Sequence, residues 1–449
     1  MRREAALPAL DDAPPIELVR DGRVSRTVSL SAVSEVRVSN VDKKSEPGEL
    51  PVRLCNYTDV YKNDYITDDL EFMRATASRA EIARFGLRIG DVVITKDSET
   101  PDDIGIPSLV DEAAADLVCG YHLAMIRPSP DKVDPTFLAK QLAQPRIAQY
   151  YGQQANGSTR YGLPMAAIER TPIWMPELAQ QRGIGLLARQ LDAAIERSSA
   201  LIAKLKLARA GLLDDLLTFG LDNFGQLREP DRLRPTKIGL RPVTWKVGSL
   251  GQFVDKAEYG TNLSLSDVAD GIPVLRMNNI VDGEFDLSDL RYSAVRTVEK
   301  FRVRKDDVLF NRTNSWEHVG KAAIWRNREP GPAFASYLVR LHCTNELSPK
   351  FLHLWINWPP VQRSIRTMAT PGVQQVNINP TNLRRTSIAV PDTAEEQEAI
   401  VDRFEALSRE IEDVQCDFRK LRAVRGGLFS DLLSGRTRLP KTIEAGTAS

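Results

Sequence analysis

The sequence predicts an α/β (α+β) protein built as a tandem repeat, in which each of two globules is followed by a long α-helix. The two helices are expected to pair as an antiparallel coiled coil. Three observations predict this fold. The chain of 449 residues matches itself at an offset of about 216 residues, which indicates two copies of one structural unit. Each copy begins with short strand-like runs, and each ends with apolar residues at heptad spacing.

The repeat is clearest where residues 85–93 align with residues 301–309 without a gap. Residues 50–52 and 272–274 open corresponding segments at an offset nearer 222, as an insertion or deletion in a loop would produce. Further matches pair Gly157 with Gly372, Pro164 with Pro380, Pro176 with Pro391, Gln181 with Gln397, Gly211 with Gly427, and Leu216 with Leu432.

The first part of each copy is predicted to be an α/β globule. Short β-branched or aromatic runs lie between turn residues at 91–95, 308–310 and 322–325, a pattern typical of strands. These runs place the two globules at residues 25–176 and 243–392.

The second part of each copy is predicted to be a long helix, over residues 177–220 and 393–435. In the second copy the heptad seam consists of Ile400, Phe404, Leu407, Ile411, Val414, Phe418, Leu421, Leu428 and Leu432. In the first copy it consists of Ile184, Ala188, Leu191, Ile195, Ser198, Ile202, Leu205, Leu212 and Leu216. A single heptad stripe can equally pack on its own globule. Two equivalent seams favour an antiparallel pair, about 60 Å long at 1.5 Å per residue.

The remaining segments are predicted to connect or flank these parts. Residues 221–242 are rich in charge, glycine and proline, as expected of a linker. Residues 1–24 and 436–449 are expected to be flexible ends.

The composition restricts the class of protein. The chain has 42% hydrophobic and 27% charged residues, near the averages of globular proteins. It contains no run of roughly 18 to 20 apolar residues that could span a membrane, and its first 24 residues lack the apolar core of a secretion signal. We therefore expect a cytoplasmic protein without a membrane partner.

Sequence motifs of catalysis and metal binding are absent. The four cysteines form no C-x-x-C pair, and the four histidines show no paired ligand spacing. No Walker A sequence occurs. Asn357-Trp358-Pro359-Pro360 resembles the Asn-Pro-Pro-aromatic motif of adenine methyltransferases only superficially, because Trp358 interrupts it. We interpret it as a helix end, and we expect no bound metal and no catalytic residue.

Several segments resemble the specificity subunits of type I restriction-modification systems. In the second copy they are residues 245–251, 271–276 and 306–310, together with Ile388-Ala389-Val390-Pro391 before Glu395-Glu396-Gln397. The resemblance covers about residues 25–436. The first copy departs from the pattern, because it lacks the opening tryptophan and has Arg53-Leu54-Cys55 where the second copy has Leu275-Arg276.

The resemblance implies a non-catalytic DNA-binding subunit in phage defence. Each globule would be a target-recognition domain for one half of an interrupted site in double-stranded DNA. The helices would separate the globules and dock two methyltransferase subunits, which would bind S-adenosylmethionine, while this chain would bind no cofactor. It remains open whether restriction or translocase subunits join, or whether another phage-defence system uses the subunit. A two-headed protein-interaction scaffold is the alternative from another class.

The charge of the chain indicates that any DNA-binding surface is local. The chain holds 60 basic and 60 acidic side chains. Residues 243–392 hold 19 Lys and Arg against 15 Asp and Glu, and residues 25–175 hold 17 against 21. Because phosphate contacts supply most sequence-independent affinity, the first globule needs a concentrated basic face.

Polar loops after aligned strands supply the candidate DNA-contacting residues. Arginine can pair with guanine, and asparagine or glutamine can pair with adenine. Strand-end cations and amide-containing glycine turns are also common without any such role. In the first globule the candidates are Lys96, Ser98, Ser158, Thr159, Arg160 and Tyr161. In the second they are Tyr259, Thr261, Asn262, Arg312, Asn314, Gln374, Gln375 and Asn377.

Overall fold

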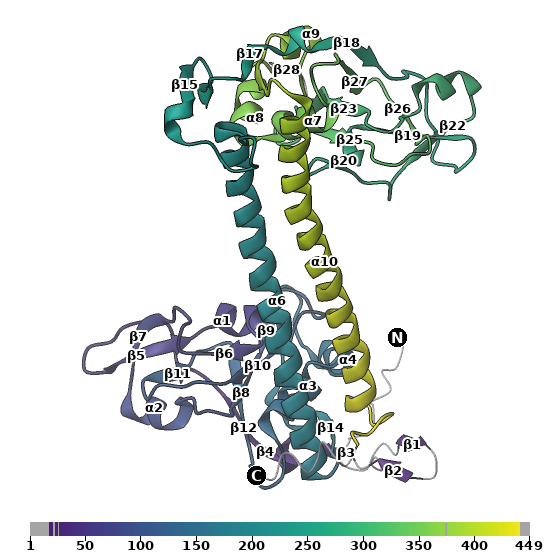
Figure 1. Ribbon diagram of the computed structural model, residues 1–449. Coiled ribbons are helices and arrows are strands. Elements are labelled where there is room, and N and C mark those ends of the chain that lie inside the picture. Colours follow the sequence, from purple (N-terminus) through teal and green to yellow (C-terminus); the bar gives the residue numbers. More distant parts are fainter. Residues whose placement is uncertain (1–17, 21–22, 26, 373–374, 441–449) are drawn as a thin grey trace. The chain divides into compact units, whose positions relative to one another are not determined.

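The computed structural model describes residues 18–20, 23–25, 27–372 and 375–440, and it divides into two compact units (Figure 1). The first unit comprises Met1–Ser199 and Cys416–Ser449, and the second comprises Ala200–Gln415. Of the predicted flexible ends, residues 1–17, 21, 22 and 441–449 lie outside the described residues. None of the helices in the described ranges combines the length and the apolar composition that a membrane crossing requires.

The first unit is built on two sheets. One has the strand order β4 (Ser34–Val38), β12 (Leu123–Pro128), β8 (Val92–Thr95), β10 (Pro107–Val110), β6 (Tyr65–Ile66). The other has the order β11 (Leu117–Cys119), β5 (Leu50–Cys55), β7 (Met73–Ala77). Two short ladders pair β3 (Thr27–Ser29) with β14 (Pro172–Trp174) and β9 (Asp97–Ser98) with β13 (Tyr161–Gly162). The helices of this globule are α1 (Tyr57–Lys62), α2 (Arg79–Phe85), α3 (Pro135–Leu142), α4 (Pro145–Gln154) and α5 (Met165–Glu169).

The second unit repeats this plan. Its larger sheet has the order β18 (Val254–Tyr259), β27 (Leu338–Cys343), β23 (Val308–Asn311), β25 (Ala322–Ile324), and its smaller sheet has the order β22 (Arg291–Ser293), β19 (Ile272–Leu275), β26 (Ala333–Phe334). The strand β17 (Lys246–Ser249) pairs with β30 (Ser387–Val390). A short three-stranded sheet has the order β24 (Thr313–Asn314), β29 (Val376–Asn377), β28 (Thr370–Pro371). The helices of this globule are α7 (Pro349–Asn357), α8 (Pro359–Arg366) and α9 (Pro380–Arg384).

Aligned residues make the same contacts in both units. The carboxylate of Asp91 accepts a hydrogen bond from Arg88 N at 2.8 Å, and Asp307 accepts one from Arg304 N at 2.7 Å. Gln181 Nε2 donates to Pro176 O at 2.9 Å, and its repeat partner Gln397 donates to Pro391 O at 3.3 Å. The sequence repeat is therefore also a repeat of local structure.

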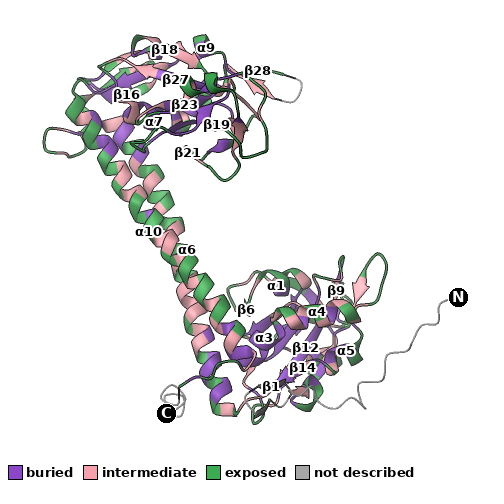
Figure 2. Cartoon of the chain, turned by 90° about the vertical axis from the view of Figure 1, so that its right-hand side faces the viewer, coloured by how far each residue is buried: buried purple, intermediate pink, exposed green. Residues whose placement is uncertain are grey.

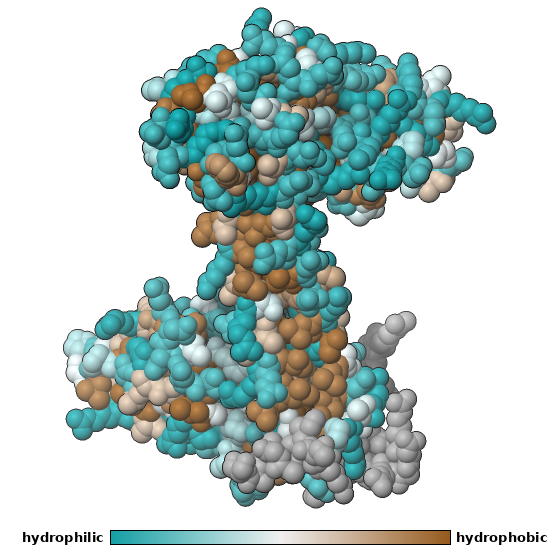
Figure 3. All heavy atoms as spheres, viewed as in Figure 1, coloured by the Kyte–Doolittle hydropathy of each residue, from teal (hydrophilic) through white to brown (hydrophobic). Residues whose placement is uncertain are grey.

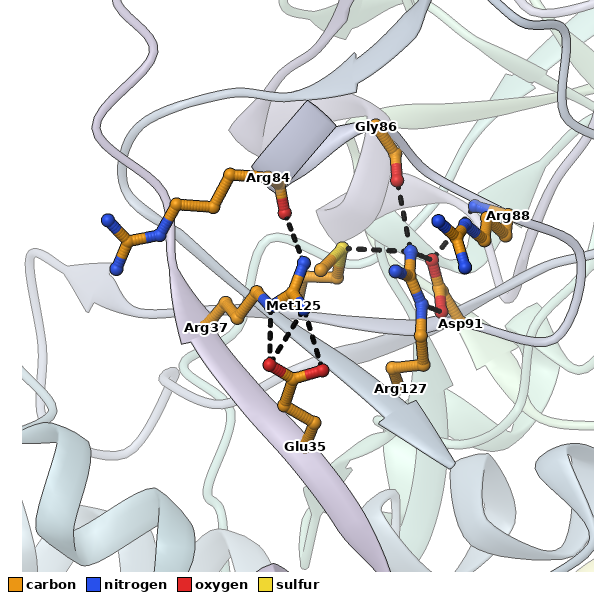
Figure 4. A network of polar contacts seen from close by, with 8 residues as sticks. All are labelled: Glu35, Arg37, Arg84, Gly86, Arg88, Asp91, Met125 and Arg127. Carbon is orange, nitrogen blue, oxygen red and sulfur yellow. Dashed lines mark hydrogen bonds and ion pairs between the residues drawn. The ribbon is translucent and has the colours of Figure 1, made fainter. Parts of the chain in front are cut away.

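An ionic network in the first unit extends the Asp91 contact (Figure 4). Arg127 donates to both oxygens of the buried Asp91 carboxylate and to Gly86 O at 3.0 Å. Arg37 pairs with Glu35 and donates to Arg84 O at 2.6 Å. Because Arg84 and Gly86 lie at the end of α2, the network holds this helix against β4, β8 and β12.

The long helices α6 (Leu178–Phe219) and α10 (Ala394–Leu433) run antiparallel. Each unit contains the N-terminal half of one helix and the C-terminal half of the other. The heptad residues are buried or half-buried, whereas most residues between them are exposed (Figure 2). For example, Ile184 packs in the first core with Leu432, and Ile400 packs in the second core with Leu216. The predicted helix pairing and the predicted fold class are confirmed.

In the second unit an indole covers the glycine that ends α6. Trp245 is 1% exposed, and its ring lies 5.9 Å from the ring of Phe351. Its Nε1 donates to Glu396 at 2.9 Å. Gly220 has a φ of +62°, and a Cβ there would lie 2.8 Å from Trp245 Cζ2. Only glycine fits this position, because the backbone is left-handed and the indole leaves no room.

The first unit lacks the opening tryptophan but fills the same place. Trp174 packs 6.1 Å from the ring of Phe137, and Gly435, with a φ of +73°, ends α10 against its indole. Trp174 comes from β14, the closing strand of the globule, whereas Trp245 precedes β17, the opening strand. The two copies thus supply an equivalent indole from opposite members of one strand pair.

A second ionic network joins the first globule to both long helices. Asp192 of α6, 11% exposed in its side chain, lies 2.7 Å from Lys140 Nζ of α3 and 2.6 Å from Arg425 Nε of α10. Tyr65 of β6 donates to the same carboxylate at 2.7 Å. Asp64 also contacts Lys140 and Arg425, at 3.3 and 3.1 Å. Three elements of the unit therefore meet at Asp192.

The segment predicted as a linker, residues 221–242, has regular structure. A turn at its start is closed by hydrogen bonds from Phe224 N and Gln226 N to the Asp222 carboxylate. The strands β15 (Leu233–Thr236) and β16 (Gly239–Pro242) then form a hairpin. Its charged and glycine-rich composition concealed these strands, because turns and short exposed hairpins use the same residues.

Candidate nucleic-acid interface

In the second unit, two polar loops that lie far apart in the sequence form one short ladder. β23 ends at Asn311, and the chain continues through Arg312 into β24, which pairs with β29 in the register Thr313 with Asn377. Arg312 Nη2 donates to Asn377 Oδ1 at 3.0 Å. The guanidinium carbon of Arg312 lies 5.1 Å from the ring centre of Tyr259. The candidates Tyr259, Arg312 and Asn377, which come from three different segments of the sequence, therefore lie together.

These contacts orient Arg312 without using all of its donors. Stacking on Tyr259 and the bond to Asn377 fix the guanidinium plane. Arg312 Nη2 bonds to Asn377, and Arg312 Nη1 bonds to no atom of the described residues. The guanidinium therefore retains N–H groups on Nη1 for an acceptor outside the protein.

The first unit builds the same frame around Lys96. Lys96 N donates to His122 O at 2.8 Å, and Lys96 O accepts from Leu163 N at 2.9 Å. Correspondingly, Arg312 N donates to Tyr337 O at 3.1 Å, and Arg312 O accepts from Ile378 N at 2.8 Å. The residues that follow Lys96 form β9, which pairs with β13 in the register Ser98 with Tyr161. Aligned loops therefore meet at the same end of both globules.

The first unit has a hollow of about 950 Å³ at this place. Predicted candidates line it together with residues that the sequence did not single out, and the lining includes Ser98, Thr159, Arg160, Tyr57, Tyr121 and His122. Lys96 Nζ pairs with Asp97 at 3.0 Å, and His122 also bonds to Asp97. Burial raises the pKa of Asp97, but the hydrogen bonds from His122 and Lys96 outweigh burial and hold this pKa below its ordinary value. The carboxylate of Asp97 thus offsets the charge of Lys96. At the equivalent position after Arg312 the second unit has Thr313, which carries no charge.

The remaining candidates differ in exposure. Ser158, Thr159, Arg160 and Asn262 are exposed, and Asn314 and Gln375 are half-buried. Ser98 and Thr261 are buried, at 7% and 4% exposed. Thr261 Oγ1 accepts a hydrogen bond from Leu263 N at 3.2 Å. Gln374 lies outside the described residues.

Gly260, which lies between the candidates Tyr259 and Thr261, is not required by a left-handed turn. Its φ is not in the left-handed region, and a Cβ there would lie 2.1 Å from Phe334 O. Gly260 is required because two backbones approach each other closely.

Comparison with known proteins identifies the architecture. The family model described as the type I restriction modification DNA specificity domain matches residues 242–415. The EcoBI specificity subunit, of a type I restriction enzyme of Escherichia coli, is 26% identical over 264 residues, which cover 55% of this chain and 53% of that protein. The chain spans about half the length of the curated relatives it matches.

Solved structures extend the similarity over nearly the whole chain. The crystal structure of the type I restriction-modification S subunit from M. genitalium has a TM-score of 0.57 and 12% identity, and the match covers 94% of this chain and 98% of that one. A chain from a structural study of complex assembly and conformational transition of the type I R-M system has a TM-score of 0.50 and 14% identity, covering 91% and 97%. Both likenesses concern the fold. The matched specificity domain lies in the second copy of the repeat. The chain is similar to the specificity subunits of type I restriction-modification systems, in sequence over about half of its length and in fold over nearly all of it.

Proposed function

We propose that this chain reads a bipartite, interrupted site in double-stranded DNA, with one half-site for each unit. The observation that carries this proposal is the shared frame around Lys96 and Arg312. The same backbone hydrogen bonds hold both positions, while the side chains that surround them differ. Two equivalent frames with different side chains suit two different half-sites, so we expect the whole site to be asymmetric.

The chemistry of the second unit supports direct contact with bases. Arg312 lies over the ring of Tyr259 and keeps the donors of Nη1 free among the described residues, and an arginine can pair with the two acceptors of guanine in the major groove. Asn314 of β24 and Gln375, which directly precedes β29, carry amides, and amides of this type pair with adenine.

We also propose that the paired helices dock two methyltransferase subunits, which bind S-adenosylmethionine and supply the chemistry. On α6 of the second unit, Leu201 is 44% and Leu207 is 76% exposed. Figure 3 shows apolar residues on the exposed surface along the long helices. Exposed apolar patches on a helix are typical of protein interfaces, so this surface suits a protein partner better than DNA.

Exchanging residues 243–392 for the equivalent globule of another specificity subunit should change one half-site and leave the other intact. The reason is that each frame is complete within its own unit. The measurement is the methylated motif in cells that express the exchanged chain with its methyltransferase, determined by methylome sequencing. A simultaneous change of both half-sites would contradict the assignment of one half-site to each unit.

The same system tests whether the chemistry lies elsewhere. The purified chain with S-adenosylmethionine and DNA should transfer no methyl groups, whereas its complex with a methyltransferase should methylate adenine. Methyl transfer by the chain alone would overturn the proposed division of labour. DNA binding by the complex should also weaken steeply as salt rises, because phosphate contacts release counterions; a salt-independent complex would favour the protein-interaction scaffold.

Replacing Arg312 by alanine should weaken recognition by about 1–3 kcal/mol at a single base pair. The loss follows from removing a paired contact to guanine while Asn377 and Tyr259 remain in place. Competition binding of the complex to DNA duplexes substituted at each position of the motif measures the effect. An equal loss of affinity for all duplexes would instead assign Arg312 to a phosphate.

A further inference from the structure

A further loop, which the sequence did not indicate, borders the candidate base-reading residues of the second unit. It follows β19 and comprises Arg276 and a single 3-10 turn, Met277–Asn279. The carbonyl of Met277 accepts hydrogen bonds from Asn311 Nδ2 at 2.9 Å and from Asn314 Nδ2 at 3.3 Å. Gln375 Nε2 lies 3.6 Å from the sulfur of Met277. The loop is thus bonded to both of the polar loops that form the ladder.

The first unit has an equivalent segment at the same place. It follows β5, comprises Asn56 and the first turn of α1 (residues 57–59), and places Tyr57 and Thr58 in the lining of the hollow together with Ser98 and Arg160. Burial raises the pKa of the Tyr57 phenol, and a hydrogen bond with Ser98 and the charge of Arg160 act in the opposite direction. Tyr57 is therefore close to candidates from both polar loops of the first unit.

The backbone of the loop is fixed in the same way in both units. Arg276 N donates to Asn279 Oδ1 at 2.8 Å, and Asn56 N donates to Asp59 Oδ2 at 2.8 Å. A side-chain acceptor three residues ahead closes the loop in each case. Between these bonded residues lie Tyr57 and Thr58 in one unit and Met277 and Asn278 in the other. The hydrogen bond that closes the segment is therefore the same in both units, whereas the two residues between its donor and its acceptor differ.

The second unit also supports the loop from behind. Asn279 is 2% exposed, and its Nδ2 donates to Asp286 O at 2.8 Å and to Asp289 O at 3.0 Å. Arg276 Nη2 pairs with Asp289 at 2.6 Å. Asn278 is exposed, and its amide bonds to no side chain or backbone atom among the described residues. A supported backbone that presents a free amide loses little conformational entropy when that amide binds.

We infer that this loop is a further specificity determinant in each unit, with Asn278 contacting a base in one half-site and Thr58 contacting a base in the other. An amide can donate to and accept from the major-groove edge of adenine, and a threonine hydroxyl can bond to several bases. The inference rests on the proposed function, and it assigns residues that lie 34 or more positions away from Arg312 and 38 or more away from Lys96 in the sequence.

Replacing Asn278 by alanine in the complex with its methyltransferase tests the inference. The amide is absent from the variant while Met277 O and the support from Asn279 remain, so the fold should persist. We expect discrimination at one position of one half-site to fall roughly 10- to 100-fold, the range of one good paired contact. The measurement is the methylation rate on duplexes that carry each base at each position. Thr58→Val should act in the same way on the other half-site only.

Asn345→Ala is the matched control. Asn345 is an exposed asparagine of the same unit, and it follows the C-terminal end of β27. Tyr337, whose carbonyl accepts from Arg312 N, precedes the other end of this strand. At 3.4 Å per residue the two ends of β27 are about 20 Å apart. The control substitution should leave every position unchanged. If Asn278→Ala behaves like this control, or slows methylation equally at all positions, the inference is wrong. If the wild-type complex methylates no defined motif, the proposed function fails instead, before any variant is compared.

Discussion

Replacing Trp245 by alanine should lower the free energy of unfolding of the second unit by about 3–5 kcal/mol, the usual cost of removing a buried tryptophan. The indole is 1% exposed, packs on Phe351 and lies against the glycine that ends α6. Its removal leaves a cavity where the first and last strands of the globule meet the helix pair. The Nε1 donor to Glu396 is also lost, although Arg228 still pairs with that carboxylate.

Urea unfolding followed by circular dichroism measures the loss, and hydrogen exchange assigns it to residues 200–415. Trp316→Ala is the control, because Trp316 is 52% exposed and surface substitutions usually change stability by less than about 0.5 kcal/mol. Equal effects of the two substitutions would show that the Trp245 contact contributes no special stability.

Replacing Asp192 by asparagine should destabilise the first unit by about 3 kcal/mol, because the buried Lys140 and the half-buried Arg425 lose their nearest counter-charge and keep only the exposed carboxylate of Asp64. The carboxylate lies within 2.7 Å of Lys140 and 2.6 Å of Arg425, and the Lys140 side chain is only 10% exposed. Asparagine keeps the shape of aspartate, so the substitution tests the charge itself. Hydrogen exchange in residues 178–199 and 416–433, where the helices belong to this unit, should rise together with exchange in α3.

The neighbouring pair of Lys420 and Asp417 provides the comparison. It joins residues of α10 at 3.0 Å, but its side chains are 69% and 77% exposed. Asp417→Asn should therefore cost less than about 1 kcal/mol. A cost for Asp192→Asn no larger than that of Asp417→Asn would show that the network does not hold the globule to the helices.

The sequence was sufficient to predict the fold class and the ends of strands where the polar loops begin. The offset that relates Gln181 to Gln397 also relates Lys96 to Arg312, and both pairs occupy equivalent places in the structure. The apolar pattern and the sequence repeat reflect the arrangement of helices and strands, and both copies of a duplicated unit retain this arrangement. The site residues themselves remain predictions, because equivalent positions do not determine which base a side chain contacts.

The loop at Met277 could not be found in this way. Its contacts with Asn311 and Gln375 depend on how β19 and its parallel neighbour β26 lie beside the larger sheet, and no local pattern encodes that placement. The alignment of residues 50–52 with 272–274 only relates the segments of the two units to each other, because each segment begins where its strand ends. The equivalence of Trp174 and Trp245 was concealed for a related reason, since they occupy different strands and match only in space.

The placement of these two tryptophans restricts how such genes can recombine. A crossover between the opening and closing strands of a globule would combine an opening tryptophan with Trp174, so that two indoles compete for one space, or would produce a hybrid with neither. Both hybrids disturb the packing at the glycine that ends a helix. Productive junctions therefore lie outside the strand pair, and a globule is inherited as one block. An exchange of residues 243–392 meets this condition, because the block carries both Trp245 and β30.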